Sequence, residues 1–258
     1  MISMKDLKSV ELLTREFWKA QVATDEFQKL FQGKEIGQRI ASYVDENTTE
    51  MLENSFDVMG EVDYKGKKRS RSMGDVWIKS NGMYNPVNVK AGEAGKNGQP
   101  NMVSLTKLIE AILDEEVDSY YLLIVKMERL KMPSKAGSSE FLITPHVYLV
   151  DMLDYLQYIT FDSGPGQAML KEKPFYEAYR SGNIPPTLTL AAKLVKMIDL
   201  YEDGNRRLFE NRVKKTGSYS GKSACVQSAW STRYKPEWYE TWLRQNHRGI
   251  CDDSLVNG

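Results

Sequence analysis

The fold that this sequence predicts is decided by one stretch, Gly74-Asp75-Val76-Trp77-Ile78-Lys79, which continues through Ser80-Asn81-Gly82 to Val87-Asn88-Val89-Lys90. Residues 75–79 include the β-branched and aromatic side chains that strands favour. The Asn81-Gly82 pair is the strongest short signal for a two-residue hairpin turn. Residues 87–90 alternate apolar with polar side chains, which is typical of a half-buried strand. The sequence therefore predicts a β-hairpin.

Three polar side chains of this hairpin form a candidate site. Side chains in a strand repeat every second residue, so Asn88 and Lys90 share one face while Val87 and Val89 point into the core. Asp75, at the start of the first strand, can then meet the amide oxygen and the lysine on the neighbouring strand. Phosphodiester hydrolysis needs a carboxylate that holds a divalent metal and a fixed cation near the water or the phosphate. The hairpin supplies both groups.

The order of Asp75, Asn88 and Lys90 resembles the PD-(D/E)xK nucleases, with an amide in place of the middle acid. A polar loop follows Lys90, then a Gln-x-Pro-Asn-like segment at 99–102 and a helix led by Ser104, as in HincII-type type II restriction endonucleases. This resemblance covers about residues 73–109 and extends more thinly from 33 to 161. It implies an α/β, restriction-endonuclease-like fold, in which helices flank a mixed central β-sheet.

The resemblance also implies roles for individual residues. Asp75 becomes a ligand of Mg²⁺, Asn88 takes the second metal-ligand position, and Lys90 becomes the catalytic lysine. Glu35 stands near the place of a glutamate that reaches the metal site from the helix before the first core strand; a glutamate that merely compensates the helix dipole is the alternative. The DNA-contact candidates are Lys96, Asn97, Gln99 and Asn101 in the loop after Lys90, and Lys67, Lys68, Arg69 and Arg71 in a basic turn before Asp75.

Two of these expectations have competing interpretations. The basic turn can equally be a solvated hairpin tip. The glycines around Lys96 invite comparison with a phosphate-binding P-loop, but their spacing is wrong and no Ser or Thr follows the lysine, so no nucleotide cofactor is expected.

Asn88 is the main departure from the family pattern. An amide oxygen can ligate a hard cation but brings no charge, so another acid is needed to restore metal affinity. Glu35, Glu61 and Glu93 are the candidates. Three accounts stay open: a natural variant with a migrated acid, an inactivating substitution, or a DNA-binding relative that no longer cuts.

Composition bounds the class of protein. The chain has 258 residues, 41% hydrophobic and 27% charged, as expected of an ordinary globular protein with a full core. No apolar run approaches the roughly 20 residues that span a membrane, and the first residues lack the apolar core of a signal peptide, so we expect a cytoplasmic protein without membrane contact. Two cysteines and two histidines supply neither a disulfide framework nor a four-ligand zinc site.

Patterning along the chain predicts helices at 4–32 and 34–47, a strand at 55–64, an amphipathic helix from Ser104, a buried strand at 120–127 and a strand at 141–144 that ends at Pro145. Helices follow at 175–180 and at 188–202, the latter ending near Gly204, and residues 205–215 extend a basic helix. The predicted organisation is a nuclease core at 1–163 and a mainly helical, basic and aromatic C-terminal subdomain at 164–258. The aromatic and basic residues of its tail fit either DNA contact or a core.

The resemblance implies a magnesium-dependent endodeoxyribonuclease of type II restriction character that cuts duplex DNA as a homodimer at a palindromic site. Two alternatives stay open. One is a non-catalytic DNA-binding module on a nuclease scaffold, and the other is a repair or phage nuclease that acts on structured DNA.

Overall fold

The computed structural model describes residues 4–30, 37–56, 58–59, 73–80, 83–95, 100–131, 141–162, 164–183, 185–186 and 188–216. Two compact units divide the chain, Met1–Ile198 and Asp199–Gly258. The sheets and the candidate site belong to the first unit.

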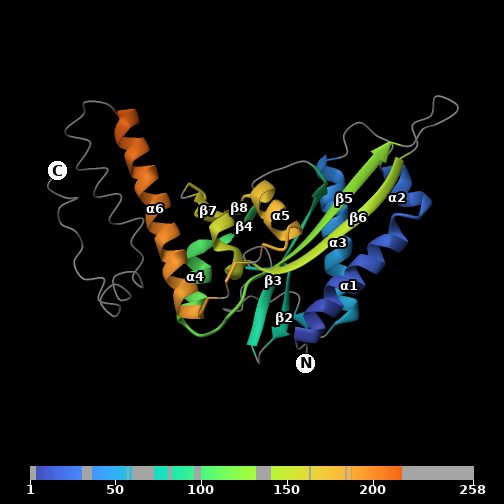
Figure 1. Cartoon of the computed structure of the whole chain (residues 1–258), viewed down its shortest axis with the longest axis horizontal. Coiled ribbons are helices and arrows are strands. Elements are labelled where there is room, and N and C mark those ends of the chain that lie inside the picture. The colour runs from blue at the N-terminus through green and yellow to red at the C-terminus, as the bar shows by residue number, and fades with distance from the viewer. Residues whose placement is uncertain are drawn as a thin grey trace. The chain divides into compact units, whose positions relative to one another are not determined.

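A five-stranded sheet forms the centre of the first unit (Figure 1). Its strands, in spatial order, are β1 (Val58–Met59), β2 (Val76–Ser80), β3 (Met83–Glu93), β5 (Tyr121–Lys131) and β6 (Phe141–Asp151). All neighbours pair antiparallel except β3 and β5, which are parallel. Parallel neighbours need a crossover, and the chain supplies one through β4 (Asn101–Ser104) and α4 (Leu105–Leu113). The predicted mixed sheet is therefore confirmed.

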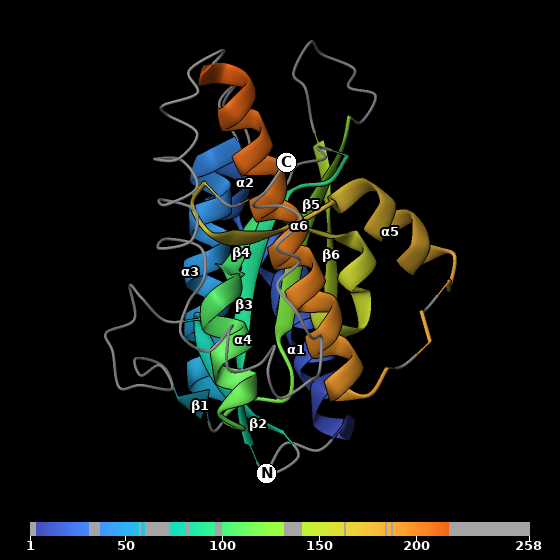
Figure 2. The same cartoon turned by 90° about the vertical axis from the view of Figure 1, so that its left-hand side faces the viewer.

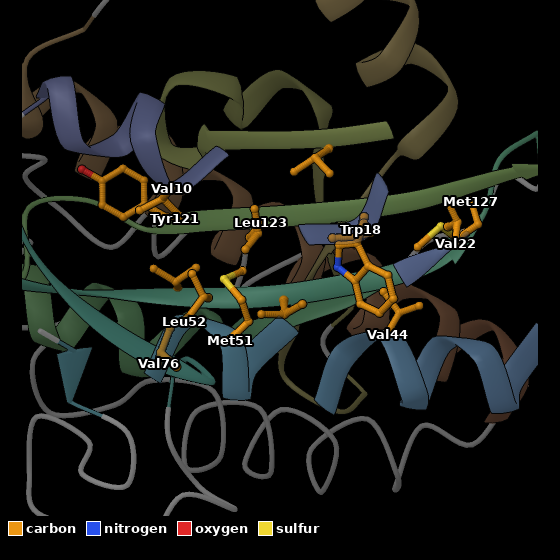
Figure 3. Packing of buried hydrophobic residues seen from close by; sticks show 14 of the residues in the cluster. Val10, Trp18, Val22, Val44, Met51, Leu52, Val76, Tyr121, Leu123 and Met127 are labelled. Atoms are coloured by element: carbon orange, nitrogen blue, oxygen red, sulfur yellow. The ribbon is translucent and has the colours of Figure 1, made fainter. Parts of the chain in front are cut away.

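Helices α1 (Met4–Gln21) and α3 (Gly37–Ser55) cover one face of this sheet. Figure 3 shows their apolar side chains meeting those of the strands. Trp18 of α1 is fully buried there, and its Nε1 donates to Thr48 Oγ1 of α3 at 2.9 Å. Burial of this indole therefore leaves no unpaired donor, and the two helices are fixed to each other as well as to the sheet.

The opposite face is covered by smaller elements. In Figure 2, α4 lies in front of β3, whereas α1 lies behind it. A second sheet has the order β4, β8 (Gln167–Leu170) and β7 (Ile159–Asp162), and α5 (Glu172–Arg180) packs its tyrosines on Tyr148 of β6. The ring centroids of Tyr148 and Tyr176 are 5.6 Å apart. No sequence pattern predicts this second sheet.

The N-terminal helices differ from their predicted bounds. The single helix expected at 4–32 is two helices, α1 and α2 (Asp25–Leu30). Thr24 separates them because its Oγ1 accepts the N–H of Phe27 at 3.3 Å, which starts a new helix in the manner of an N-cap. The second predicted helix is α3, which continues past residue 47 to Ser55; residues 34–36 of that prediction lie outside the described residues.

Two predicted stops were also wrong. The strand expected to end at Pro145 is β6, which continues to Asp151. The helix expected to end near Gly204 and the basic helix expected at 205–215 are one helix, α6 (Leu190–Thr216), which continues through that glycine. A glycine inside a helix costs only about 1 kcal/mol relative to alanine, so good helix formers around it can sustain the helix.

Proline is tolerated in β6 because β6 is the last strand of the sheet. The Val147 carbonyl and the Leu149 N–H contact side chains of α1, so the backbone groups of these odd-numbered residues point away from β5. Pro145 is also odd-numbered, so its nitrogen also points away from β5. The N–H that it lacks would not have joined the ladder, and no strand bond is lost.

Candidate active site

The predicted hairpin is formed by β2 and β3, which pair antiparallel with Val76 opposite Val87. Asp75 directly precedes β2, and its N–H donates to the Val87 carbonyl at 2.8 Å, so Asp75 lies against the segment of β3 that carries Val87 and Asn88. Residues 81 and 82, the predicted turn, lie outside the described residues.

The Asp75 carboxylate is held against β3. Its Oδ2 accepts the backbone N–H of Val89 at 2.7 Å. That N–H belongs to the peptide that joins Asn88 to Val89, so the carboxylate lies beside the segment that carries Asn88 and Lys90. Its other oxygen, Oδ1, accepts no hydrogen bond from the described residues. One oxygen therefore anchors the side chain, and the other is available to a ligand.

Gly74 allows the close approach of these strands. A Cβ built at this glycine would lie 2.9 Å from Pro86 Cβ and 2.9 Å from both the nitrogen and the carbonyl oxygen of Val87. Two of these atoms are backbone and cannot move without shifting β3. The glycine before Asp75 is therefore a packing requirement of the site.

Asn88 and Lys90 share one face of β3. Val87 and Val89, which alternate with them, are buried in the cluster under α1 and α3. The register between β3 and β5 runs without a shift from Val87 to Glu93, so this alternation is regular along the strand. The structure thus brings Asp75, Asn88 and Lys90 together as the sequence predicts.

The Asn88 amide is buried, with 8% of the residue exposed. Its Nδ2 donates to the Met102 carbonyl of β4 at 3.3 Å, and its Oδ1 has no hydrogen-bond partner among the described residues. An aspartate at this position could not donate to Met102. The amide therefore joins the two sheets while its oxygen is left for another partner.

Lys90 is half-buried and forms no ion pair within the described part of the chain. Its neighbour across the parallel pair is Ile124. A lysine that is not neutralised by a described carboxylate can direct its charge toward an anion.

A second lysine on the same face is neutralised. Lys126 of β5 lies opposite Gly92, which shares the face of Asn88 and Lys90. Its Nζ is 2.6 Å from Glu172 Oε1 at the start of α5, and both side chains are almost completely buried. A Cβ at Gly92 would lie 3.0 Å from that Nζ. The sequence does not predict the Lys126–Glu172 pair, because no local motif links a strand residue with a helix so distant in the sequence.

Glu93 cannot serve as the replacement acid on this face. Glu93 is an even number of residues from Val87 and Val89, so it lies on their face of β3 and not on the face of Asn88 and Lys90. Its Oε1 lies 3.9 Å from Arg129 Nε. Of the predicted DNA contacts, Asn101 is exposed at the start of β4, next to the Met102 carbonyl that Asn88 contacts. The remaining site candidates lie outside the described residues: Glu35, Glu61, Lys67, Lys68, Arg69, Arg71, Lys96, Asn97 and Gln99.

His146 of β6 is partly buried and hydrogen-bonded. Its Nε2 lies 2.8 Å from Glu128 Oε2 on the adjacent strand.

The donors fit magnesium. Within the described ranges, no three His, Cys, Asp or Glu side chains gather into a metal cluster. Mg²⁺ does not need one, because it keeps several waters and is bound through one or two carboxylates together with substrate phosphates. The carboxylate of Asp75 and the amide oxygen of Asn88 are hard oxygen ligands of that kind.

Comparison with known families finds no family model that matches this chain, and no curated protein matches it either. Among the described helices, none is both long and apolar enough to cross a membrane.

Proposed function

We propose that this protein is a magnesium-dependent endodeoxyribonuclease of type II restriction character. The observation that carries the proposal is the juxtaposition of Asp75, Asn88 and Lys90 on adjacent antiparallel strands, with the Asp75 carboxylate bonded to the Val89 N–H at 2.7 Å. A carboxylate, an amide oxygen and a lysine that pairs with no carboxylate of the described residues are, on one sheet face, suited to a metal ion and a phosphodiester.

Each residue has a distinct role in this proposal. Asp75 and Asn88 would hold the magnesium ion, which supplies Lewis-acid polarisation of a phosphoryl oxygen and lowers the pKa of a bound water. Lys90 places its ammonium group where negative charge develops during attack on the phosphate, or orients the nucleophile. The Val89 N–H keeps the carboxylate in one orientation, so little rearrangement accompanies the reaction.

The restriction-endonuclease-like fold, duplex DNA and a homodimer belong to the same proposal. The mixed sheet supports the fold, because the two site strands are antiparallel neighbours and a helix crosses over to the next, parallel strand. Asn101 supports a DNA-reading role for β4, because it is exposed beside the residue that Asn88 contacts. A two-fold dimer would match a palindromic site.

Cleavage of a long sequenced DNA with and without Mg²⁺ tests this function. We expect discrete fragments whose mapped ends share one short sequence, and no fragments when EDTA is added. Asp75→Ala should lower the cleavage rate by at least about 100-fold, because it removes the charged metal ligand, while gel-shift affinity for the DNA persists. Asp114→Ala, an exposed carboxylate after α4, is the control. Undiminished cleavage by Asp75→Ala would exclude this site.

A non-catalytic DNA-binding module is the second candidate. The bond from Asn88 Nδ2 to the Met102 carbonyl favours it, because it gives the amide a structural use that is independent of metal binding. This candidate predicts a sequence-specific gel shift that is unaffected by Mg²⁺, together with intact DNA after prolonged digestion.

A further inference from the structure

Tyr120 lies on the site face of the sheet. It directly precedes β5, where Tyr121 is part of the core under α1 and α3. Successive strand side chains point to opposite faces, so Tyr120 projects toward the side of Asp75 and Asn88. Val87 pairs with Tyr121, and this register places Tyr120 within two residues of Asn88 along the neighbouring strand.

The backbone of Tyr120 is fixed at this position. Its N–H donates to Asp151 Oδ1 at 3.2 Å, and its carbonyl accepts the N–H of Met152 at 2.8 Å. The residue is 0% exposed. The ring therefore has little freedom to move its hydroxyl elsewhere.

The hydroxyl of Tyr120 has no hydrogen-bond partner among the described residues, and the same is true of Asn88 Oδ1. A buried polar atom without a partner costs about 1–3 kcal/mol. The Asp75 carboxylate is close enough to contribute, after burial, to raising the pKa of Tyr120. A tyrosine hydroxyl can donate one hydrogen bond, and this one has no acceptor among the described residues.

We propose that Tyr120 is a positioning residue of a hydrated divalent-cation site, in which Asp75 and Asn88 are the ligands and the Tyr120 hydroxyl bonds a water of the cation's hydration shell. Three groups on one face of neighbouring strands carry this inference: the Asp75 carboxylate, the Asn88 amide oxygen and the Tyr120 hydroxyl, the last two without a hydrogen-bond partner among the described residues. It rests on the proposed function for its two ligands, but not on cleavage. A hydrated cation would give both buried atoms a partner, and groups around the ligands commonly tune metal affinity in this way.

Manganese binding in the absence of DNA, measured by calorimetry on the full chain, tests the inference. Tyr120→Phe removes only the hydroxyl, and we expect it to weaken Mn²⁺ affinity about 10- to 100-fold. Tyr121→Phe is the matched control, because it removes a hydroxyl from the next residue on the opposite face. Its Mn²⁺ affinity should equal that of the unaltered chain.

Thermal unfolding without metal separates positioning from general stability. If Tyr120→Phe lowers the melting temperature but binds Mn²⁺ as tightly as the unaltered chain, the inference is overturned. The proposed function survives that result if Asp75→Ala still abolishes cleavage. Conversely, weakened Mn²⁺ binding by Tyr120→Phe in a chain that cuts no DNA supports the inference and rejects the nuclease. An unaltered chain that binds no Mn²⁺ overturns the inference as well.

Discussion

Asn88 differs from an aspartate in what its nitrogen does. Nδ2 donates to the Met102 carbonyl, and a carboxylate there would place two acceptors against each other. Metal affinity would therefore be higher with a carboxylate at this position, whereas the attachment of β4 requires the amide. A natural amide at this site is consistent with the structure, because the amide has a partner of its own.

Asn88→Asp should reveal this conflict. We expect the free energy of unfolding to fall by about 1–3 kcal/mol in the absence of metal, because the buried donor is lost, and Mg²⁺ affinity to rise because a charge is gained. Chemical denaturation and calorimetry measure the two effects. Magnesium-dependent cleavage should increase if the amide is an inactivating substitution or marks a relative that no longer cuts.

Asn183→Asp is the control for that variant, because the same change is made at an exposed position after α5 that has no assigned role. Unchanged stability in Asn88→Asp would contradict a structural role for the amide. Unchanged or lower cleavage would favour an acid supplied from elsewhere in the chain.

At the residue scale, the sequence was sufficient for Asp75, Asn88 and Lys90 because their arrangement depends on one hairpin and the two-residue period of a strand. It was insufficient for Tyr120 and for the Lys126–Glu172 pair. Those side chains join the site face only through the register of β5 and the position of α5, which no local pattern encodes.

The outer edge of β6 is an element that the N-terminal helix protects. Leu149 N–H donates to Glu11 Oε2 at 3.3 Å, and Arg15 donates to the Val147 carbonyl at 3.4 Å. Glu11 and Arg15 also pair with each other. Exposed strand edges invite pairing with other chains, so these two side chains occupy positions that another strand would otherwise use.

Replacing both Glu11 and Arg15 by alanine should therefore increase self-association. We expect species larger than those of the unaltered chain to grow with concentration, measured by analytical ultracentrifugation. The matched control replaces Glu16 and Lys19, a solvent-exposed pair on the same helix with both side chains 55% exposed. Equal association by the two double variants would show that the edge is protected by other means.

Elements with long apolar patterns were predicted more successfully than short ones. The continuous apolar run became β5, and the stripe after Ser104 became α4, whose buried residues include Leu105, Leu108 and Ile109. Strands β4, β7 and β8 have four residues each. So short a strand holds about two residues per face, too few for a pattern to be distinguished from a loop.

At the scale of the whole molecule, one buried carboxylate should make an unusual contribution to the pH dependence of stability. Asp151 at the end of β6 is largely buried, and this burial raises its pKa from 3.8 to about 6, although Lys193 of α6 opposes the shift. The folded state therefore binds a proton more readily than the unfolded state between these values. Protonation of this one group makes the protein more stable as the pH falls from about 6 toward 4.

Asp151→Asn should remove that contribution. An amide oxygen can still accept the N–H groups of Tyr120 and Leu153 that Asp151 Oδ1 now accepts. We expect the variant to be more stable than the unaltered chain at pH 7 by roughly 1–3 kcal/mol, with the difference vanishing near pH 4. Urea unfolding across this range measures it, with Asp114→Asn as the exposed control. A variant that is less stable at pH 7 would contradict the expected sign.

At this scale the sequence predicted the mixed sheet and its helical layers, because the hydrophobic periods of strands and helices fixed which faces must be covered. It could not predict the contact between β6 and α1, because ion pairs and capped edges between distant segments leave no periodic trace in a single chain.

Strand β3 has one apolar face and one polar face. Val87 and Val89 are inserted under α1 and α3, and Asn88 and Lys90 lie between them along the chain. Slippage by a single residue would force an ammonium group beneath two helices and expose both valines. Packing of the interior therefore also fixes the spacing of Asn88 and Lys90 on the opposite face of the strand.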